Sequence, residues 1–189
     1  DVFLQEIHRQ CADSPIIRLA TMARKGEDIS KGLSLGSVVT LQLNNDTQSH
    51  IHNPNTQVIC GLNRVRHTVT QKIRKNLGYS GDYPKEGERV ICCKNNQSEA
   101  LFNGLMGVMQ KDAQFKKMLP DGAQYIPNFS VKMEDFEEGH KLNVDPYLFK
   151  SHFTTNKLNK IIPERDADIK SFNEFDWAYA ITCHKAQGS

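Results

Sequence analysis

Residues Trp177-Ala178-Tyr179-Ala180-Ile181 form an apolar run, which the polar cluster Thr182-Cys183-His184-Lys185-Ala186-Gln187-Gly188-Ser189 follows at once. Such a run predicts a buried strand, and in open α/β sheets ligands lie beyond the carboxyl ends of buried strands. The hydroxyl, imidazole and ammonium groups of the cluster suit phosphate oxygens, and its glycine allows a close backbone approach. The spacing by itself is equally compatible with an ordinary strand-to-helix turn whose polar residues face solvent.

Composition sets limits on the kind of protein. The chain has 189 residues, 38% hydrophobic and 24% charged, which is ordinary for a globular protein. A net charge of +2 means that any nucleic-acid surface must come from local clusters of Lys and Arg. The longest apolar runs have four or five residues, far fewer than the roughly twenty that cross a bilayer. We therefore expect a cytoplasmic protein with no membrane partner.

The cysteines indicate a reducing compartment. They are odd in number, include no C-x-x-C pair, and are Cys11, Cys60, Cys92, Cys93 and Cys183. His50 and His52 lie in a polar stretch without further ligands at a fitting spacing, so the sequence predicts no metal site.

The first half of the chain predicts alternating helices and strands. We expect a helix from Pro15 to about Arg24 that ends at Gly26, followed by a strand over Ser37–Leu43. The first helix has an apolar stripe that we expect to face inward, made of Ile16, Ile17, Leu19, Ala20 and Ala23. A short buried strand over Gln57–Cys60 then precedes a helix that ends at Gly78. The outer face of this helix is basic and predicts a solvated surface, formed by Arg64, Arg66, Lys72, Arg74 and Lys75.

The character of the sequence changes after Pro84. From Arg89 onward, short apolar segments alternate with turn residues, which predicts a small β-barrel. The pair Asn103-Gly104, with apolar neighbours on both sides, predicts a hairpin with a type I′ turn.

Three segments, in this order, resemble one family of motor proteins. Leu4–Gln10 with Ser14–Ile17 resembles motif IV of the superfamily-one helicases in their RecD/Dda-like form. Lys94-Asn95-Asn96 with Phe102-Asn103-Gly104 resembles the entry into the barrel inserted in these helicases, and Ala178–Ser189 resembles their motif V. The resemblance spans nearly the whole chain, but residues 111 to 170 match in character only.

The resemblance implies a fold and a division into domains. It implies an α/β class with a RecA-like parallel sheet, helices on both faces, and an inserted small SH3-like β-barrel. Residues 1–88 and 171–189 would form the second motor domain, incomplete at its C-terminus, and residues 89–170 would form the barrel. The chain would then be a fragment of a larger protein.

The implied function is that of an ATP-dependent DNA helicase, bacterial or phage-encoded, that moves five-prime to three-prime on single-stranded DNA and unwinds duplex. No G-x-x-x-x-G-K-[ST] motif occurs, so ATP and Mg²⁺ would be bound mainly by a first motor domain, and this piece alone should be inactive. Its partners would be single-stranded DNA, the N-terminal motor domain and other replication or recombination proteins. Two alternatives remain, a non-catalytic nucleic-acid-binding or loader subunit and an exonuclease V alpha-type subunit of a nuclease complex.

The resemblance also assigns a nucleotide side to the site. Arg9 would contact the γ-phosphate as a catalytic and ATP-binding residue, and His8 would stand where related motors carry an aromatic ring against adenine. Gln187 and Gly188 match the part of motif V that faces the nucleotide. Without the resemblance, a salt bridge from Arg9 to a nearby acidic residue would be preferred.

The DNA side of the site would grip the strand backbone. In the family, Thr182 and His184 match residues that hold the DNA backbone, and Lys185 would add charge attraction. Further candidates lie where strand meets helix and where the barrel begins, namely Asn63, Arg64, Lys94, Asn95 and Asn103. The simpler interpretation of these five is a solvated helix face and the polar turns of a barrel.

Overall fold

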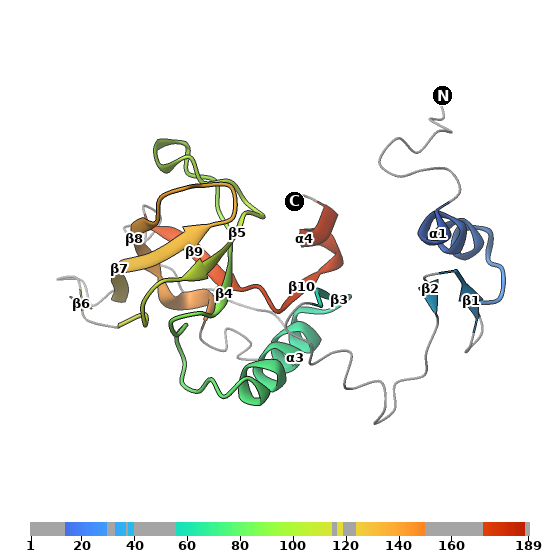
Figure 1. The fold of residues 1–189 in the computed structure, drawn as a ribbon, viewed down its shortest axis with the longest axis horizontal. Coiled ribbons are helices and arrows are strands. Elements are labelled where there is room, and N and C mark those ends of the chain that lie inside the picture. Colours follow the sequence, from blue (N-terminus) through green and yellow to red (C-terminus); the bar gives the residue numbers. More distant parts are fainter. Residues whose placement is uncertain are drawn as a thin grey trace, which may run out of the picture. The chain divides into compact units, whose positions relative to one another are not determined.

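The computed structural model describes residues 14–29, 33–36, 38–39, 56–114, 117–118, 124–149 and 172–187. The chain divides into two compact units, Asp1–Ile51 and His52–Ser189. Figure 1 shows the elements of each unit under the labels used below. None of the helices in these ranges is long and apolar enough to cross a membrane.

The first unit contains one helix and one hairpin. Helix α1 (Pro15–Lys25) begins with proline and ends at Gly26, whose φ of 70° lies in the left-handed region, so the predicted helix is confirmed. Strands β1 (Ser34–Leu35) and β2 (Val38–Val39) pair antiparallel. The predicted strand over residues 37–43 lies mostly outside the described residues. The inward stripe is wrong in part: Ile17 and Leu19 are half-buried, whereas three members are exposed, namely Ile16, Ala20 and Ala23.

The second unit is built around a closed β-barrel of five strands. These are β4 (Arg89–Cys92), β5 (Met106–Met109), β7 (Gln124–Met133), β8 (His140–Asp145) and β9 (Asn173–Trp177). Their order is β5-β4-β9-β8-β7, and pairing of β5 with β7 closes the barrel. Only the β8–β9 pair among them is parallel. The short strands expected after Arg89 therefore do form a barrel.

Smaller elements complete the barrel. Strand β6 (Lys117–Met118) pairs with β7, and two short 3-10 helices are η1 (Gln97–Glu99) and η2 (Pro146–Leu148). The barrel interior is apolar, and its fully buried side chains include Val90, Ile126, Phe129, Val144 and Phe175. Phe129 contacts both Phe149 and Phe175, with ring centroids 5.9 and 5.1 Å away.

The sequence predicted a single buried strand over the apolar run Trp177–Ile181, and this prediction is wrong. Strand β9 ends at Trp177, the chain bends at Ala178 and Tyr179, and β10 (Ala180–Thr182) then leaves the barrel. The bend is fixed because the Ala178 N–H donates to the Arg89 carbonyl at 3.0 Å. One buried run thus serves two different sheets, and the barrel includes residues that the resemblance assigned to the motor domain.

The predicted RecA-like fold is wrong for the described residues. Outside the barrel, their one parallel sheet joins β10 to β3 (Val58–Cys60) through three residue pairs. Their α-helices are α1, α3 (Asn63–Asn76) and the short α4 (Cys183–Gln187), which do not cover two faces of a sheet. The physical reason is visible in β3, where Ile59 is 55% exposed although strands of a doubly covered parallel sheet are buried on both faces. Most of the buried apolar side chains belong to the barrel instead.

Helix α3 follows β3 and ends as predicted. Gly78 has a φ of 83°, and the Gly78 and Tyr79 N–H groups donate to the carbonyls of Lys75 and Arg74, which is the hydrogen-bond pattern of a Schellman cap. The expectation of a solvated basic face is wrong for two of its residues. Arg66 and Arg74 are buried, at 6% and 1% exposed, because each meets a buried carboxylate of the barrel.

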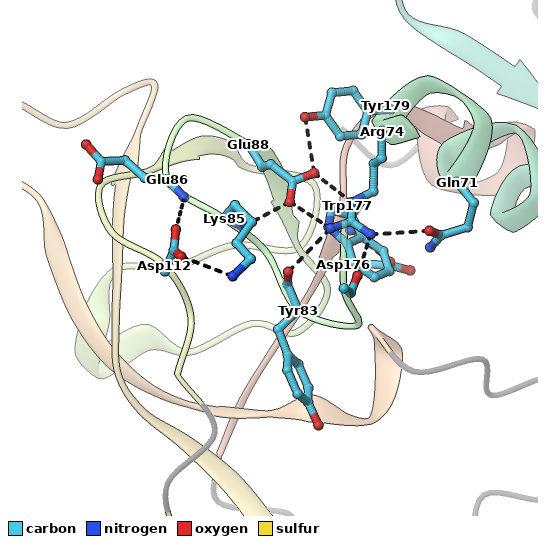
Figure 2. Close-up of polar contacts among 11 residues, drawn as sticks. Gln71, Arg74, Tyr83, Lys85, Glu86, Glu88, Asp112, Asp176, Trp177 and Tyr179 are labelled. Carbon is cyan, nitrogen blue, oxygen red and sulfur yellow. Dashed lines mark hydrogen bonds and ion pairs between the residues drawn. The ribbon is translucent and has the colours of Figure 1, made fainter. Parts of the chain in front are cut away.

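Arg74 is a buried polar link between α3 and the barrel, as Figure 2 shows. Its guanidinium donates to both oxygens of the Glu88 carboxylate, at 2.7 and 2.9 Å, and to the Gly81 carbonyl at 2.9 Å. The same group lies 4.2 Å from the centre of the Trp177 ring. Glu88 is fully buried and also accepts hydrogen bonds from the Lys85 N–H and the Tyr179 hydroxyl. This network fixes α3, the start of β4 and the end of β9 to one another.

Candidate functional site

The end of β9, strand β10 and the start of α3 enclose a pocket of about 280 Å³, which we call the junction pocket. Its lining residues come from α3, β4, β9, β10 and α4, with one from η2. Three of them are predicted DNA-binding residues, Asn63, Thr182 and Lys185. Folding has therefore placed residues from the beginning of α3 and from the motif V-like segment around one cavity.

A buried ion pair forms one wall of the junction pocket. The Arg66 Nη1 lies 2.6 Å from the Asp176 Oδ2, and both side chains are less than one-tenth exposed. Arg66 also donates from Nε to the Asn63 Oδ1 at 3.3 Å, which orients that amide. Burial raises the pKa of the Asp176 carboxyl to about 6, and the Arg66 charge opposes this rise. The sequence missed the role of Arg66, because nothing in the local pattern indicates a partner on β9.

Thr182 positions the short helix α4. Its Oγ1 accepts a hydrogen bond from the Lys185 N–H at 3.3 Å, which is the contact of an N-capping threonine. This bond holds the first turn of α4 and so fixes where the Lys185 side chain begins. Thr182 therefore acts on the site through Lys185 as well as lining the pocket itself.

Lys185 connects the terminal segment to the barrel. Its Nζ donates to the Oδ1 of Asn103, a residue 82 positions earlier in the chain. Asn103 in turn is held by its own N–H, which donates to the Asn95 Oδ1 at 2.7 Å. Three predicted DNA-binding residues thus form one chain of contacts, which we call the Lys185–Asn103 bridge.

The Asn103-Gly104 turn differs from the predicted type I′. The Leu105 N–H donates to the Phe102 carbonyl at 3.1 Å, and Gly104 has a φ of 103°, but Asn103 does not have the positive φ that type I′ demands. A positive φ only at the third position is the arrangement of a type II turn, which explains the glycine there. The turn projects Asn103 toward Lys185 and leaves Phe102 exposed.

Three other predicted DNA-binding residues take no part in this bridge. Lys94 is half-buried and donates from Nζ to the Phe172 carbonyl at 3.3 Å, so its ammonium is engaged by the barrel. Arg64 and His184 are exposed and do not line the junction pocket. Of the predicted nucleotide-facing residues, Gln187 is exposed at the end of α4. His8, Arg9 and Gly188 lie outside the described residues.

The electrostatics indicate where an anion would bind. Inside the junction pocket, the Arg66 guanidinium is already paired with Asp176, and Glu174 adds a second carboxylate, so the depth of the cavity does not favour a phosphate. Lys185 lines this cavity and hydrogen-bonds Asn103, which lies outside its lining, and the Lys185 ammonium and the Asn103 amide N–H groups are donors for phosphate oxygens. Burial raises the pKa of the Cys93 thiol to about 12, so this lining thiol stays protonated at neutral pH and is a poor nucleophile. The arrangement suits binding of a phosphate at the Lys185–Asn103 bridge better than covalent catalysis in the cavity.

Across the part of the chain with described coordinates, no group of three or more His, Cys, Asp or Glu residues could hold a metal ion. Comparison with protein-family models gives no match, and comparison with curated proteins gives none either. The site therefore has to be interpreted from its own chemistry and from the resemblance of its motifs.

Proposed function

We propose that this chain is part of an ATP-dependent DNA helicase of the RecD/Dda kind and that the Lys185–Asn103 bridge holds the backbone of single-stranded DNA. The contact between Lys185 and Asn103 is the observation that carries the proposal. Both residues were assigned to DNA on separate sequence motifs, and their side chains are hydrogen-bonded although they lie 82 positions apart.

The chemistry of the bridge supports this assignment. An ammonium and a carboxamide are donors for phosphate oxygens, and backbone contacts of this kind carry no sequence information, as a motor moving along any sequence requires. Asn63 and Thr182 add a further amide and hydroxyl on the pocket wall. The hydrogen bond between Lys185 and Asn103 also fixes both side chains, so less conformational entropy is lost when a phosphate binds.

The ATP-dependent part of the proposal rests on the sequence resemblance. Arg9, Gln187 and Gly188 would contact the nucleotide, with ATP and Mg²⁺ bound mainly by another domain. In that arrangement Gln187 on the nucleotide side and Lys185 on the DNA side belong to the same short helix, α4. A shift of α4 on nucleotide binding would therefore move the DNA contact, which is a two-state coupling hypothesis.

The test is a salt titration of single-stranded DNA binding. The 189-residue chain and its Lys185→Ala variant are titrated against a fluorescent oligothymidylate by anisotropy, at salt concentrations from about 50 to 200 mM. Loss of one charge-assisted contact should weaken binding by about tenfold. It should also reduce the slope of log affinity against log salt by about 0.7, the value for one phosphate on a single strand.

The matched control is Lys141→Ala. Lys141 is an exposed lysine on β8. It lines neither the junction pocket nor the surface around the Asn103-Gly104 turn. The Lys141→Ala variant loses the same net charge as Lys185→Ala. Because the lost charge is not part of the proposed site, the affinity and the slope should stay close to those of the unaltered chain. If Lys185→Ala and Lys141→Ala behave alike, the phosphate contact is wrongly assigned. If the unaltered chain does not bind the oligonucleotide, the proposed function is wrong.

A further inference from the structure

Phe102 is an exposed aromatic residue on a well-fixed turn. Its side chain is 54% exposed, although most other aromatic residues described in the barrel are buried. Backbone hydrogen bonds hold the turn on both sides: Gly104 N–H to the Cys92 carbonyl at 3.0 Å, and Leu101 N–H to the Asn96 carbonyl at 2.9 Å. The ring therefore stands on a rigid support and contributes little to the core.

A shallow hollow lies beside this ring. It has a volume of about 440 Å³ and is lined by residues 102–106 together with Glu134 and Asp135. A volume of this size lies in the range of small-ligand sites. The lining of the hollow combines an aromatic ring and apolar neighbours with two carboxylates.

The charges around the hollow orient any nucleotide that enters it. Asn103, the residue next to Phe102, belongs to the Lys185–Asn103 bridge, so the phosphate donors lie immediately beside the ring. Glu134 and Asp135, which also line the hollow, repel a phosphate from it. The uncharged part of a nucleotide, its base, is the part that fits against Phe102.

We infer that Phe102 stacks on a base of the single-stranded DNA whose phosphate is held by Lys185 and Asn103. This inference rests on the proposed function and adds to it the way in which the base is held. Every base has a π face, so stacking on Phe102 is tolerant of sequence, as a binding site for any strand requires. Phe102 was not singled out as a binding residue from the sequence, where it belonged to the segment resembling the barrel entry and was the apolar neighbour of a turn.

The test uses oligonucleotides in which a single base is replaced by the fluorescent analogue 2-aminopurine, whose emission falls when it stacks on an aromatic ring. The unaltered chain should quench the analogue most strongly at one position of the strand. Phe102→Ala should remove this quenching and weaken binding roughly five- to a hundredfold, the range measured for one stacked base. Phe102→Tyr, which keeps a ring, should retain both the quenching and the affinity.

The salt dependence separates this inference from the proposed function. Phe102→Ala should leave the slope of log affinity against log salt unchanged because no phosphate contact is lost, whereas Lys185→Ala should reduce it. If Phe102→Ala leaves affinity and quenching unaltered while Lys185→Ala reduces the slope, the stacking is overturned and the phosphate site is retained. No DNA binding by the unaltered chain would overturn both. A melting temperature for Phe102→Ala within about 2 °C of the unaltered chain shows that the exposed ring was removed without unfolding.

Discussion

Replacing Arg74 by methionine should strongly destabilise the unit that carries the candidate site. Arg74 is 1% exposed and donates two hydrogen bonds to Glu88, a carboxylate that has no exposed surface. The methionine side chain keeps much of the packing volume beside Trp177, so the change acts mainly on charge and hydrogen bonding. It leaves a buried carboxylate with only the Lys85 N–H and the Tyr179 hydroxyl as donors.

The magnitude follows from these contacts. Breaking a buried ion pair by removal of one partner costs about 3–5 kcal/mol, because the remaining charge is uncompensated. Loss of the contact with the Trp177 ring, 4.2 Å away, adds about 0.5–2 kcal/mol. Since the free energy of unfolding of a domain is about 5–15 kcal/mol, this variant should lie near the limit of folding.

Urea unfolding followed by circular dichroism measures the loss. Trp177, the single tryptophan of the chain, gives a local fluorescence signal from the same network. Adding Glu88→Gln to Arg74→Met removes the stranded charge and should restore at least about 1 kcal/mol. A loss below about 1 kcal/mol for Arg74→Met, or a double variant no more stable than the single one, would refute this account of how α3 is fixed to the barrel.

Three further changes test other parts of the structure. Thr182→Val removes the cap of α4 and should lower the affinity for single-stranded DNA about two- to fivefold. Thr182→Ser keeps the hydroxyl and should bind as tightly as the unaltered chain. Equal binding by both variants would exclude the capping role. Gly107→Ala places a Cβ 2.7 Å from the Lys132 carbonyl oxygen and should lower the free energy of unfolding by about 1–3 kcal/mol, as measured by thermal melting. The control Gly61→Ala, whose Cβ meets open space, should show no such loss. The folded-state pKa of Asp176, about 6, is above its unfolded value, so its contribution to stability is present below about pH 4 and is lost as pH rises through 6. Relative to Asp176→Asn, the unaltered chain should therefore lose about 1–3 kcal/mol between pH 4 and pH 7 in urea unfolding, and a constant difference would contradict the raised pKa.

Local signals in the sequence predicted local structure well. Gly26 and Gly78 marked the ends of α1 and α3, because a left-handed residue after a helix is a short-range requirement that glycine meets. The density of turn residues after Arg89 likewise predicted a barrel of short strands. These features depend on residues close together in the chain, and so they are visible without the fold.

Features that depend on distant partners were not predictable in the same way. The run Trp177–Ile181 looks continuous, yet it is shared between the barrel and the pairing with β3, because hydrophobicity does not reveal a change of sheet. Arg66 and Arg74 look like members of a solvated face, and only their contacts with Asp176 and Glu88 make them buried. A RecA-like sheet was expected from motif resemblance, and short motifs do not determine which strands and helices surround them.

The candidate site combines both cases. Asn103 and Lys185 were each predicted to bind DNA, but the hydrogen bond between them follows only from the path of β10 beside the barrel. The sequence carried no signal that Phe102 is exposed, because an apolar residue before a turn is normally expected to pack inward. Its exposure had to be seen in the structure.

A double-mutant cycle on single-stranded DNA affinity tests the central claim most directly. The dissociation constants of Asn103→Ala, Lys185→Ala and the double variant are measured under one salt condition. If the two residues hold one phosphate together, both single variants bind more weakly, and the double variant loses less than the sum of the single losses by at least about 0.5 kcal/mol. Strictly additive losses, or single variants that bind as tightly as the unaltered chain, would contradict a shared phosphate site.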